Sequence, residues 1–281
     1  MGIFVVSDAS PKQSGNNAMY LEKDSIIIRG ATLGLLDFSN DQCYSAGSPV
    51  AAYANMKNLV NNGSNATNGP NARVLETGML KFDGTEPNTN DYVLLPTDEF
   101  SLPSGCKRAL ISVALKLPAS GYGTPAATRY PMFFGRMNNT AAANVNFGVW
   151  GIVSTDGVLT SVQGAALGSV AISATAQLAL LTNGSVHVVS VYADGETTAG
   201  TLVTRIYVDN ILVATATNNA WDGSVPQPTN LPRIGSYPAT IHAPWNGQMV
   251  GRPMVMNLTG KSVVATDIIA QSVELAKQYL V

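Results

Sequence analysis

The sequence has 281 residues, of which 46% are hydrophobic, so it is long enough and apolar enough to form a sizeable globular core. Only 12% of the residues are charged, about half of the roughly 25% usual in globular domains, and the formal net charge is −2. Basic residues do not cluster, which excludes the electrostatic footprint of a nucleic-acid-binding protein. So few charges favour association with other surfaces.

The first residues show no targeting segment. A short apolar run lacks the positive region that precedes it in a signal peptide, and no stretch approaches the roughly 18 unbroken apolar residues of a membrane span. We therefore expect synthesis in the cytoplasm, without membrane insertion. Residues 1–31 are expected to form an arm, and residues 32–281 a single domain. The apolar residues of the arm are expected to add a strand to a neighbour: Gly2, Ile3, Phe4, Val5 and Val6.

The sequence of the rest of the chain predicts mostly short strands separated by turns. Runs such as "SIIIRG", "ALISVALKL", "NFGVWGIVS" and "VHVVSVYA" are rich in β-branched and aromatic residues, and Asp-Gly or Asn-Gly dipeptides punctuate them. In "TLVTRIYVDNIL", two apolar runs flank Asp209-Asn210, a pair that tolerates the positive φ of a two-residue turn. The pattern predicts an all-β protein with a hairpin at residues 201–212.

Two segments depart from this pattern. Residues 56–70 contain a run of Asn, Gly and Ser that predicts a polar loop. The last residues have helical periodicity, and we expect one C-terminal helix capped by Thr266. Its apolar face is predicted to comprise Ile268, Ile269, Ser272, Val273, Ala276 and Leu280.

Seven segments occur in an order that resembles a known fold. They are "GLLDFSNDQCYSAGSP", a polar loop, "MLKFDGTEPNTNDYVLLP", "VHVVSVYADG", "RIYVDNILV", "LPRIGSY" with "WNGQMVGRPMVMN", and the final helix. Together they resemble the concanavalin A-like, laminin-G-like jelly roll found in many bacteriophage structural proteins. The resemblance implies an antiparallel jelly-roll sandwich over residues 32–280. Asn210 stands where that family usually has Gly.

Catalytic residues are not expected. The glucanases of this superfamily carry E-x-D-x-x-E on one strand, and that motif is absent here. Asp98 and Glu99 are adjacent, so on a strand they would point to opposite faces, and a solvated turn explains them better. His187 lies within an apolar run and is expected to pack rather than act as a base. We expect no enzyme activity.

Metal and disulfide sites have weak support. Asp83, Asp91, Asp194 and Asp209 each fall in a turn, and none belongs to a calcium-loop string, so turn formation explains them without a metal. We expect no cofactor, while bound calcium stays open as an alternative. Cys43 and Cys106 have no metal-ligand spacing and are expected to remain unpaired.

A carbohydrate-binding surface is the remaining candidate site. Sugar rings have apolar faces that stack on flat side chains, and aromatic residues gather in a Pro-rich stretch between residues 221 and 245. The candidate binding residues are Trp221, Asp222, Tyr237, His242 and Trp245. For Trp245, and for Trp150 in another segment, core packing is the favoured alternative.

Two functions therefore follow. The first is a non-enzymatic structural protein of a phage virion, in the tail, fibre or baseplate or decorating the capsid, that displays the jelly roll for attachment to host-surface glycans. Its partners would be other virion proteins or copies of itself. The second is a stand-alone lectin module, with or without calcium.

Overall fold

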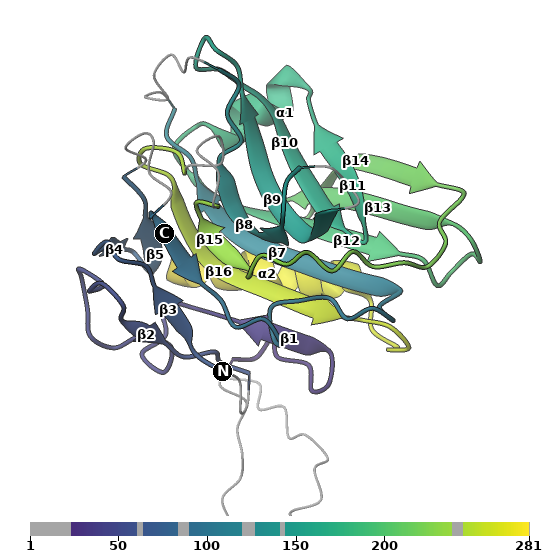
Figure 1. Cartoon of the computed structure of the whole chain (residues 1–281), viewed down its shortest axis with the longest axis horizontal. Coiled ribbons are helices and arrows are strands. Elements are labelled where there is room, and N and C mark those ends of the chain that lie inside the picture. The colour runs from purple at the N-terminus through teal and green to yellow at the C-terminus, as the bar shows by residue number, and fades with distance from the viewer. Residues whose placement is uncertain are drawn as a thin grey trace, which may run out of the picture.

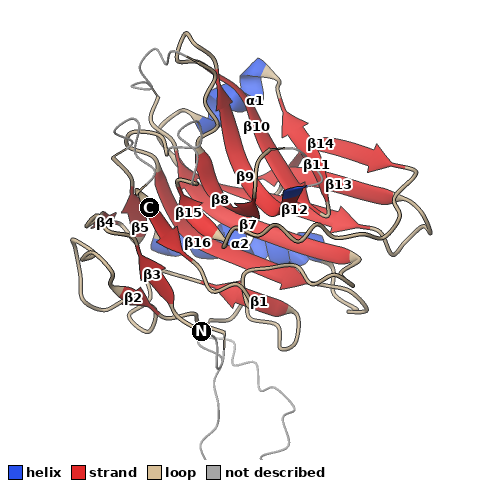
Figure 2. Ribbon diagram, viewed as in Figure 1, coloured by secondary structure: helices blue, strands red, loops and turns tan. Residues whose placement is uncertain are grey.

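The chain folds into two antiparallel sheets of eight strands each, packed face to face (Figure 1). The computed structural model describes residues 24–60, 64–83, 90–119, 127–140, 144–237 and 244–280. Among the regular elements of these residues, strands far outnumber helices (Figure 2). The predicted antiparallel sandwich is confirmed.

The first sheet joins strands that are far apart in sequence. Its spatial order is β14 (Ile211–Asn218), β13 (Leu202–Val208), β12 (Val186–Asp194), β7 (Arg108–Lys116), β16 (Met249–Asn257), β5 (Met79–Lys81) and β4 (Val74–Glu76), and β1 (Thr32–Leu35) also pairs with β16. Every pair of adjacent strands in this sheet is antiparallel.

The second sheet has the order β11 (Gly168–Ile172), β10 (Leu159–Ala166), β9 (Val145–Val153), β8 (Met132–Met137), β15 (Arg233–Gly235), β6 (Tyr92–Leu94), β3 (Ala66–Asn68) and β2 (Asn55–Met56). Strand β3 lies inside the segment that we predicted to be a polar loop, so that prediction is wrong in part. It is only three residues long and lies within an Asn- and Gly-rich segment, yet it pairs with β6, and Ala66 and Asn68 are buried.

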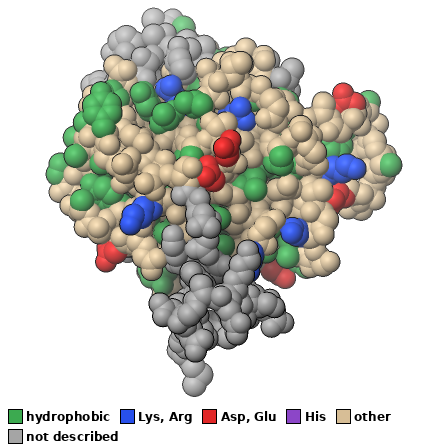
Figure 3. All heavy atoms as spheres, turned by 60° about the horizontal axis from the view of Figure 1, so that its bottom comes forward, with side chains coloured by type: hydrophobic (Ala, Val, Ile, Leu, Met, Phe, Trp, Pro, Cys, Tyr) green, Lys and Arg blue, Asp and Glu red, His purple; other side chains and the backbone are tan. Residues whose placement is uncertain are grey.

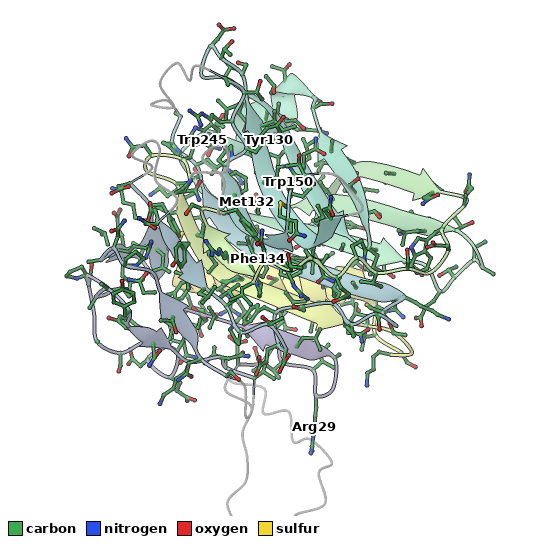
Figure 4. The ribbon with its side chains drawn as sticks, in the orientation of Figure 1. Arg29, Tyr130, Met132, Phe134, Trp150 and Trp245 are labelled. Carbon is green, nitrogen blue, oxygen red and sulfur yellow. The ribbon has the colours of Figure 1, made fainter. Side chains whose placement is uncertain are left out.

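The main core fills the space between the sheets. On β9, Phe147 and Val149 point into it, and the ring of Phe147 lies 5.0 Å from that of Phe134 on β8. Because side chains alternate along a strand, Trp150 falls on the opposite, outer face. There it joins a smaller apolar cluster that includes Met132 (both labelled in Figure 4). Trp150 is thus buried, as favoured, although outside the main core.

Helix α2 (Ala265–Tyr279) covers the outer face of the first sheet, against β7 and β12 (Figure 1). The face predicted from the sequence is buried. The predicted cap is wrong, because the helix begins at Ala265 after Val264, which makes no side-chain capping hydrogen bond. A second helix, α1 (Thr175–Leu181), was not predicted. With α2 in place, β7 is buried on both faces, which explains its nearly continuous apolar sequence.

The β13–β14 hairpin is confirmed, with φ of 49° at Asp209 and 66° at Asn210. The Asp209 carboxylate also reaches β12: Oδ2 lies 2.6 Å from Nδ1 of His187, and Oδ1 accepts a hydrogen bond from the backbone N–H of Val188. His187 is buried, as expected, and its second ring nitrogen lies 3.1 Å from Asn183 Oδ1. Its partners give it a structural role.

The start of the chain is only partly described. Gly2 to Val6 lie outside the described residues, so strand addition by the arm stays a prediction. Residues 24–31 were assigned to the same arm, yet Ile26 and Ala31 are buried in the main core. Cys43 and Cys106 are buried and free, and burial raises their pKa values to about 12 and about 11. No helix in the described ranges has the length and apolarity needed to cross a membrane.

A buried arginine joins the beginning of the described chain to its last strand. Arg252 on β16 has a φ of 44° and sits where the pairing of β16 with β7 shifts register. Its guanidinium pairs with the carboxylates of Asp37 and, at 2.9 Å, of Asp24. All three side chains are buried, so removing the cation would leave two uncompensated carboxylates.

We therefore expect Arg252→Met to lower the free energy of unfolding by about 3–5 kcal/mol, the scale for breaking a buried ion pair. Urea denaturation measures the loss. The matched control is Arg29→Met, since Arg29 is exposed and projects from the body (Figure 4), and its replacement should change stability by less than about 0.5 kcal/mol. Equal losses in both variants would contradict a role for the ion cluster.

The Asp209 contacts predict a pH dependence. Burial alone would raise the pKa of Asp209, but hydrogen bonds from His187 and Val188 outweigh it and leave the pKa below its ordinary value of 3.8. The ionised carboxylate therefore contributes stability above that value, and the contribution is lost as the pH falls through the lowered pKa.

Asp209→Asn keeps a residue that tolerates the left-handed turn, removes the charge and replaces one acceptor oxygen by an amide donor. Urea unfolding of both proteins between about pH 6 and pH 2 should show the parent more stable at the upper end and the difference shrinking toward the lower end. A difference that does not vary with pH would refute this account.

Candidate functional site

Trp221 is held rigidly in the segment that follows β14. Its backbone N–H donates to Gly200 O at 3.0 Å, and Nε1 donates to Ser224 O at 3.3 Å. The ring lies against Gly195, where an added Cβ would fall 2.0 Å from an indole carbon, so only glycine fits beneath it. The indole is partly exposed and also packs against the main core. A flat apolar surface is thus fixed in place without being fully covered.

A depression of about 260 Å³ opens beside this ring, and we call it the Trp221 depression. One wall comes from the second sheet, where Leu167 forms the turn between β10 and β11 with a φ of 63°. The rest comes from the end of β14 and the segment after it. The lining residues are Leu167, Asn218, Ala220, Trp221, Asp222, Ser224 and Pro226.

Two polar side chains of the depression are oriented by the backbone. Asp222 Oδ1 accepts from the backbone N–H of Ser224 at 2.9 Å, and Asn218 Oδ1 accepts from that of Ala220 at 3.0 Å. Hydrogen bonds from the Ser224 side chain and backbone hold the pKa of Asp222 below its ordinary value. Within the described residues, Asn218 Nδ2 has no partner, and the exposed Asp222 carboxylate has hydrogen bonds from Ser224 alone. They offer an acceptor and a donor beside the indole.

This arrangement suits binding of a small polyhydroxyl group. The volume lies just below the roughly 300–1,000 Å³ of pockets for drug-sized ligands, so it has room for about one sugar ring. Glycoside hydrolysis requires two carboxyl groups about 5–10 Å apart. Asp222 is the only carboxylate among the described lining residues.

The five residues predicted from the sequence do not form one surface. Trp221 and Asp222 meet in the depression, whereas His242 lies outside the described residues. Tyr237 was expected to be accessible, and this is wrong: it is 1% exposed, and its hydroxyl donates to Gly135 O. Strand β15 runs through the Pro-rich stretch and turns the Tyr237 ring onto the outer apolar cluster of the second sheet.

Trp245 is 5% exposed and belongs to the main core, which was the favoured alternative for this residue. Asn218, Ser224 and Leu167 were not predicted from the sequence. Asn218 ends an exposed edge strand, and Leu167 comes from the other sheet, so neither carried a local signal of its role.

The aspartates considered for calcium have protein partners. Asp91 pairs with Arg73 at 2.7 Å, and Asp194 accepts hydrogen bonds from Thr197 and from the backbone of Glu196. Asp209 is engaged by His187. Across the described ranges, no three His, Cys, Asp or Glu side chains are grouped as metal ligands would be. Asp98 and Glu99 lie in a turn, as predicted.

Known proteins resemble this chain in fold. No family of proteins and no curated sequence matches it. Trypanosoma rangeli sialidase, solved with 2-keto-3-deoxy-D-glycero-D-galacto-2,3-difluoro-nononic acid, aligns with a TM-score of 0.54 and 12% identity over 98% of this chain. The binding domain of Paraclostridial Mosquitocidal Protein 1 aligns with a TM-score of 0.54 and 10% identity over 86% of this chain. The chain spans 36% of the sialidase and 52% of the toxin domain.

Proposed function

We propose that this protein is a non-enzymatic carbohydrate-binding module and that the Trp221 depression is its binding site. The observation that carries the proposal is the fixed indole of Trp221, flanked by the exposed carboxylate of Asp222 and the unpaired Nδ2 of Asn218. An aromatic ring stacks on the apolar face of a sugar, and an oriented carboxylate and amide select its hydroxyls. Because these groups are already ordered, little entropy is lost on binding.

Two further points support binding without catalysis. The depression has one carboxylate where glycoside hydrolysis uses two. Of the similar folds, one is a toxin's binding domain and the other belongs to a sialidase crystallised with a sugar acid derivative. This chain spans only about a third of that sialidase, and the enzyme's activity is not carried over.

A glycan array with the purified protein tests the proposal. We expect binding to a restricted set of glycans, weakened by about 1–3 kcal/mol in Trp221→Ala, the scale for losing a central aromatic contact. Asp222→Asn keeps an oxygen that can accept from the Ser224 N–H, but it removes the charge and replaces the second acceptor by an amide donor, so weaker binding would report contact between the carboxylate and the ligand. Tyr279→Ala, an exposed aromatic on α2, is the control and should bind as the parent does.

Because Trp221 also packs against the core, melting curves must accompany the array, and binding must be compared well below the lowest transition. An array with no retained glycan, or equal binding by parent and Trp221→Ala, would overturn the site. Loss of binding on calcium removal would instead favour the calcium-dependent lectin.

The finer proposal is that this module is displayed on a phage virion and attaches it to host-surface glycans. The support is the resemblance of its segments to phage jelly rolls and a surface with few charges. Figure 3 shows one face of the molecule, where charged side chains are scattered without a broad patch of one sign. The apolar residues Gly2 to Val6 would dock the module on another virion protein or another copy.

Deletion of residues 1–13 tests the docking. We expect the truncated protein to melt as the parent does and to be missing from purified particles, which mass spectrometry of the virions would show. Incorporation at parental copy number would contradict the role of the arm. Absence of the parent protein from particles, combined with glycan binding, would favour the stand-alone lectin.

A further inference from the structure

Arg233 stands on the outer face of the second sheet, away from the Trp221 depression. On β15, its neighbour Ile234 points into the main core, so Arg233 points outward. It is opposite Leu94 of β6, which places Tyr92 diagonally across from it on the same face. The guanidinium carbon lies 4.2 Å from the centroid of the Tyr92 ring and 5.9 Å from that of Tyr237.

The guanidinium of Arg233 differs from those of three other arginines, which have an anion or hydrogen-bond acceptors. Arg73 pairs with Asp91, and Arg252 with two aspartates. Arg136, on the adjacent strand β8, donates to Gln227 Oε1 and to Pro228 O. In the part of the chain that the structure describes, the guanidinium of Arg233 has no ion pair and no hydrogen-bond partner, and its Nε is buried.

Burying part of a guanidinium that has neither an anion nor a hydrogen-bond acceptor costs free energy, unless a ligand supplies one. Burial lowers the pKa of Arg233, while the phenol rings of Tyr92 and Tyr237 act in the opposite direction. A stacked ring compensates a cation far less well than a hydrogen-bonded anion does. The side chain is still partly exposed, so a ligand can reach it.

We propose that Arg233 anchors a second binding site, which takes an oxyanion carried by an acidic glycan. The Tyr92 ring lies against the guanidinium and restrains it, and a restrained guanidinium can present two N–H groups to two oxygens of a carboxylate or sulfate. This inference rests on the proposed function in one respect, that the oxyanion is carried by a sugar. The anion site itself does not depend on the Trp221 depression.

The register of the sheet extends this site into a row. Leu94 is opposite Thr67 of β3, and Thr67 is opposite Asn55 of β2, so these side chains share the outer face with Arg233. The row spans three strand spacings, about 14 Å. The row begins at the Arg233 cation and crosses the apolar side chain of Leu94. It ends at a hydroxyl and an amide, and Thr67 Oγ1 donates a hydrogen bond to Asn55 Oδ1. The row suits an extended ligand with an acidic end.

Isothermal titration at low salt tests the anchor, with D-glucuronate and glucose 6-sulfate as acidic probes and glucose as their neutral match. We expect the parent to bind at least one acidic sugar about tenfold more tightly than glucose. Arg233→Met keeps the length and apolar stem and should bind that sugar no better than glucose. Arg205→Met, at a partly exposed arginine on β13 of the first sheet, is the control and should keep the preference.

Removing the uncompensated cation should not lower the melting temperature, so a folded Arg233→Met is expected, and Arg233→Gln serves as a second variant with the same expected loss. No preference for either acidic sugar in the parent, or a preference retained in both variants, would overturn the proposal. Trp221→Ala should keep the acidic preference. An empty glycan array together with that preference would leave the anion site standing and reject the Trp221 depression.

Discussion

The first sheet depends on one interaction, the buried ion pairs of the Arg252 guanidinium with Asp37 and Asp24. The guanidinium joins Asp37, 215 residues away, to the last strand, and it also holds Asp24, where the described chain begins. Strand β16 pairs with β7 along one edge. Along its other edge it pairs with β5 before the Arg252 irregularity and with β1 after it. Arg252 has a left-handed backbone there and a buried side chain, and two buried carboxylates compensate its charge.

At the two candidate sites, one at and after the end of β14 and one on β15, polar side chains are held in place by contacts that leave some of their donors or acceptors unused. Asp222 and Asn218 each use an oxygen to fix their own turn, and the exposed Asp222 carboxylate and Asn218 Nδ2 stay available. Arg233 is fixed by a ring instead of an anion. In both places the side chain is ordered by contacts that leave its chemistry unused, which is the condition for binding a ligand without reorganisation. The first sheet has no comparable outer surface along β7 and β12, because α2 covers it.

Local signals in the sequence were sufficient where structure is local. The Asp209-Asn210 turn needs two residues that tolerate positive φ, and the α2 face follows from helical spacing, so both were predicted correctly. Strand β3 could not be found, since three residues in a polar segment become a strand only when β6 pairs with them. The exposure of Tyr237 was predicted wrongly for a related reason. Its proline-rich surroundings indicate a loop, while its burial depends on the outer face of the second sheet, against which the ring packs. The Trp221 depression needed Leu167 from the other sheet, a contact that no spacing encodes.

The place of β16 in the chain also governs the order in which the fold can be completed. It is the last strand in sequence, yet it occupies the middle of the first sheet and supplies partners to β1, β5 and β7. During synthesis, β1 and β5 therefore emerge long before the strand that they pair with, and their backbone groups stay without it until nearly the whole domain has left the ribosome. The hairpins β8–β9–β10 and β12–β13–β14 pair with close neighbours in sequence and face no such delay. Closure of the first sheet is thus a late, long-range step, of the kind that makes all-β domains fold slowly.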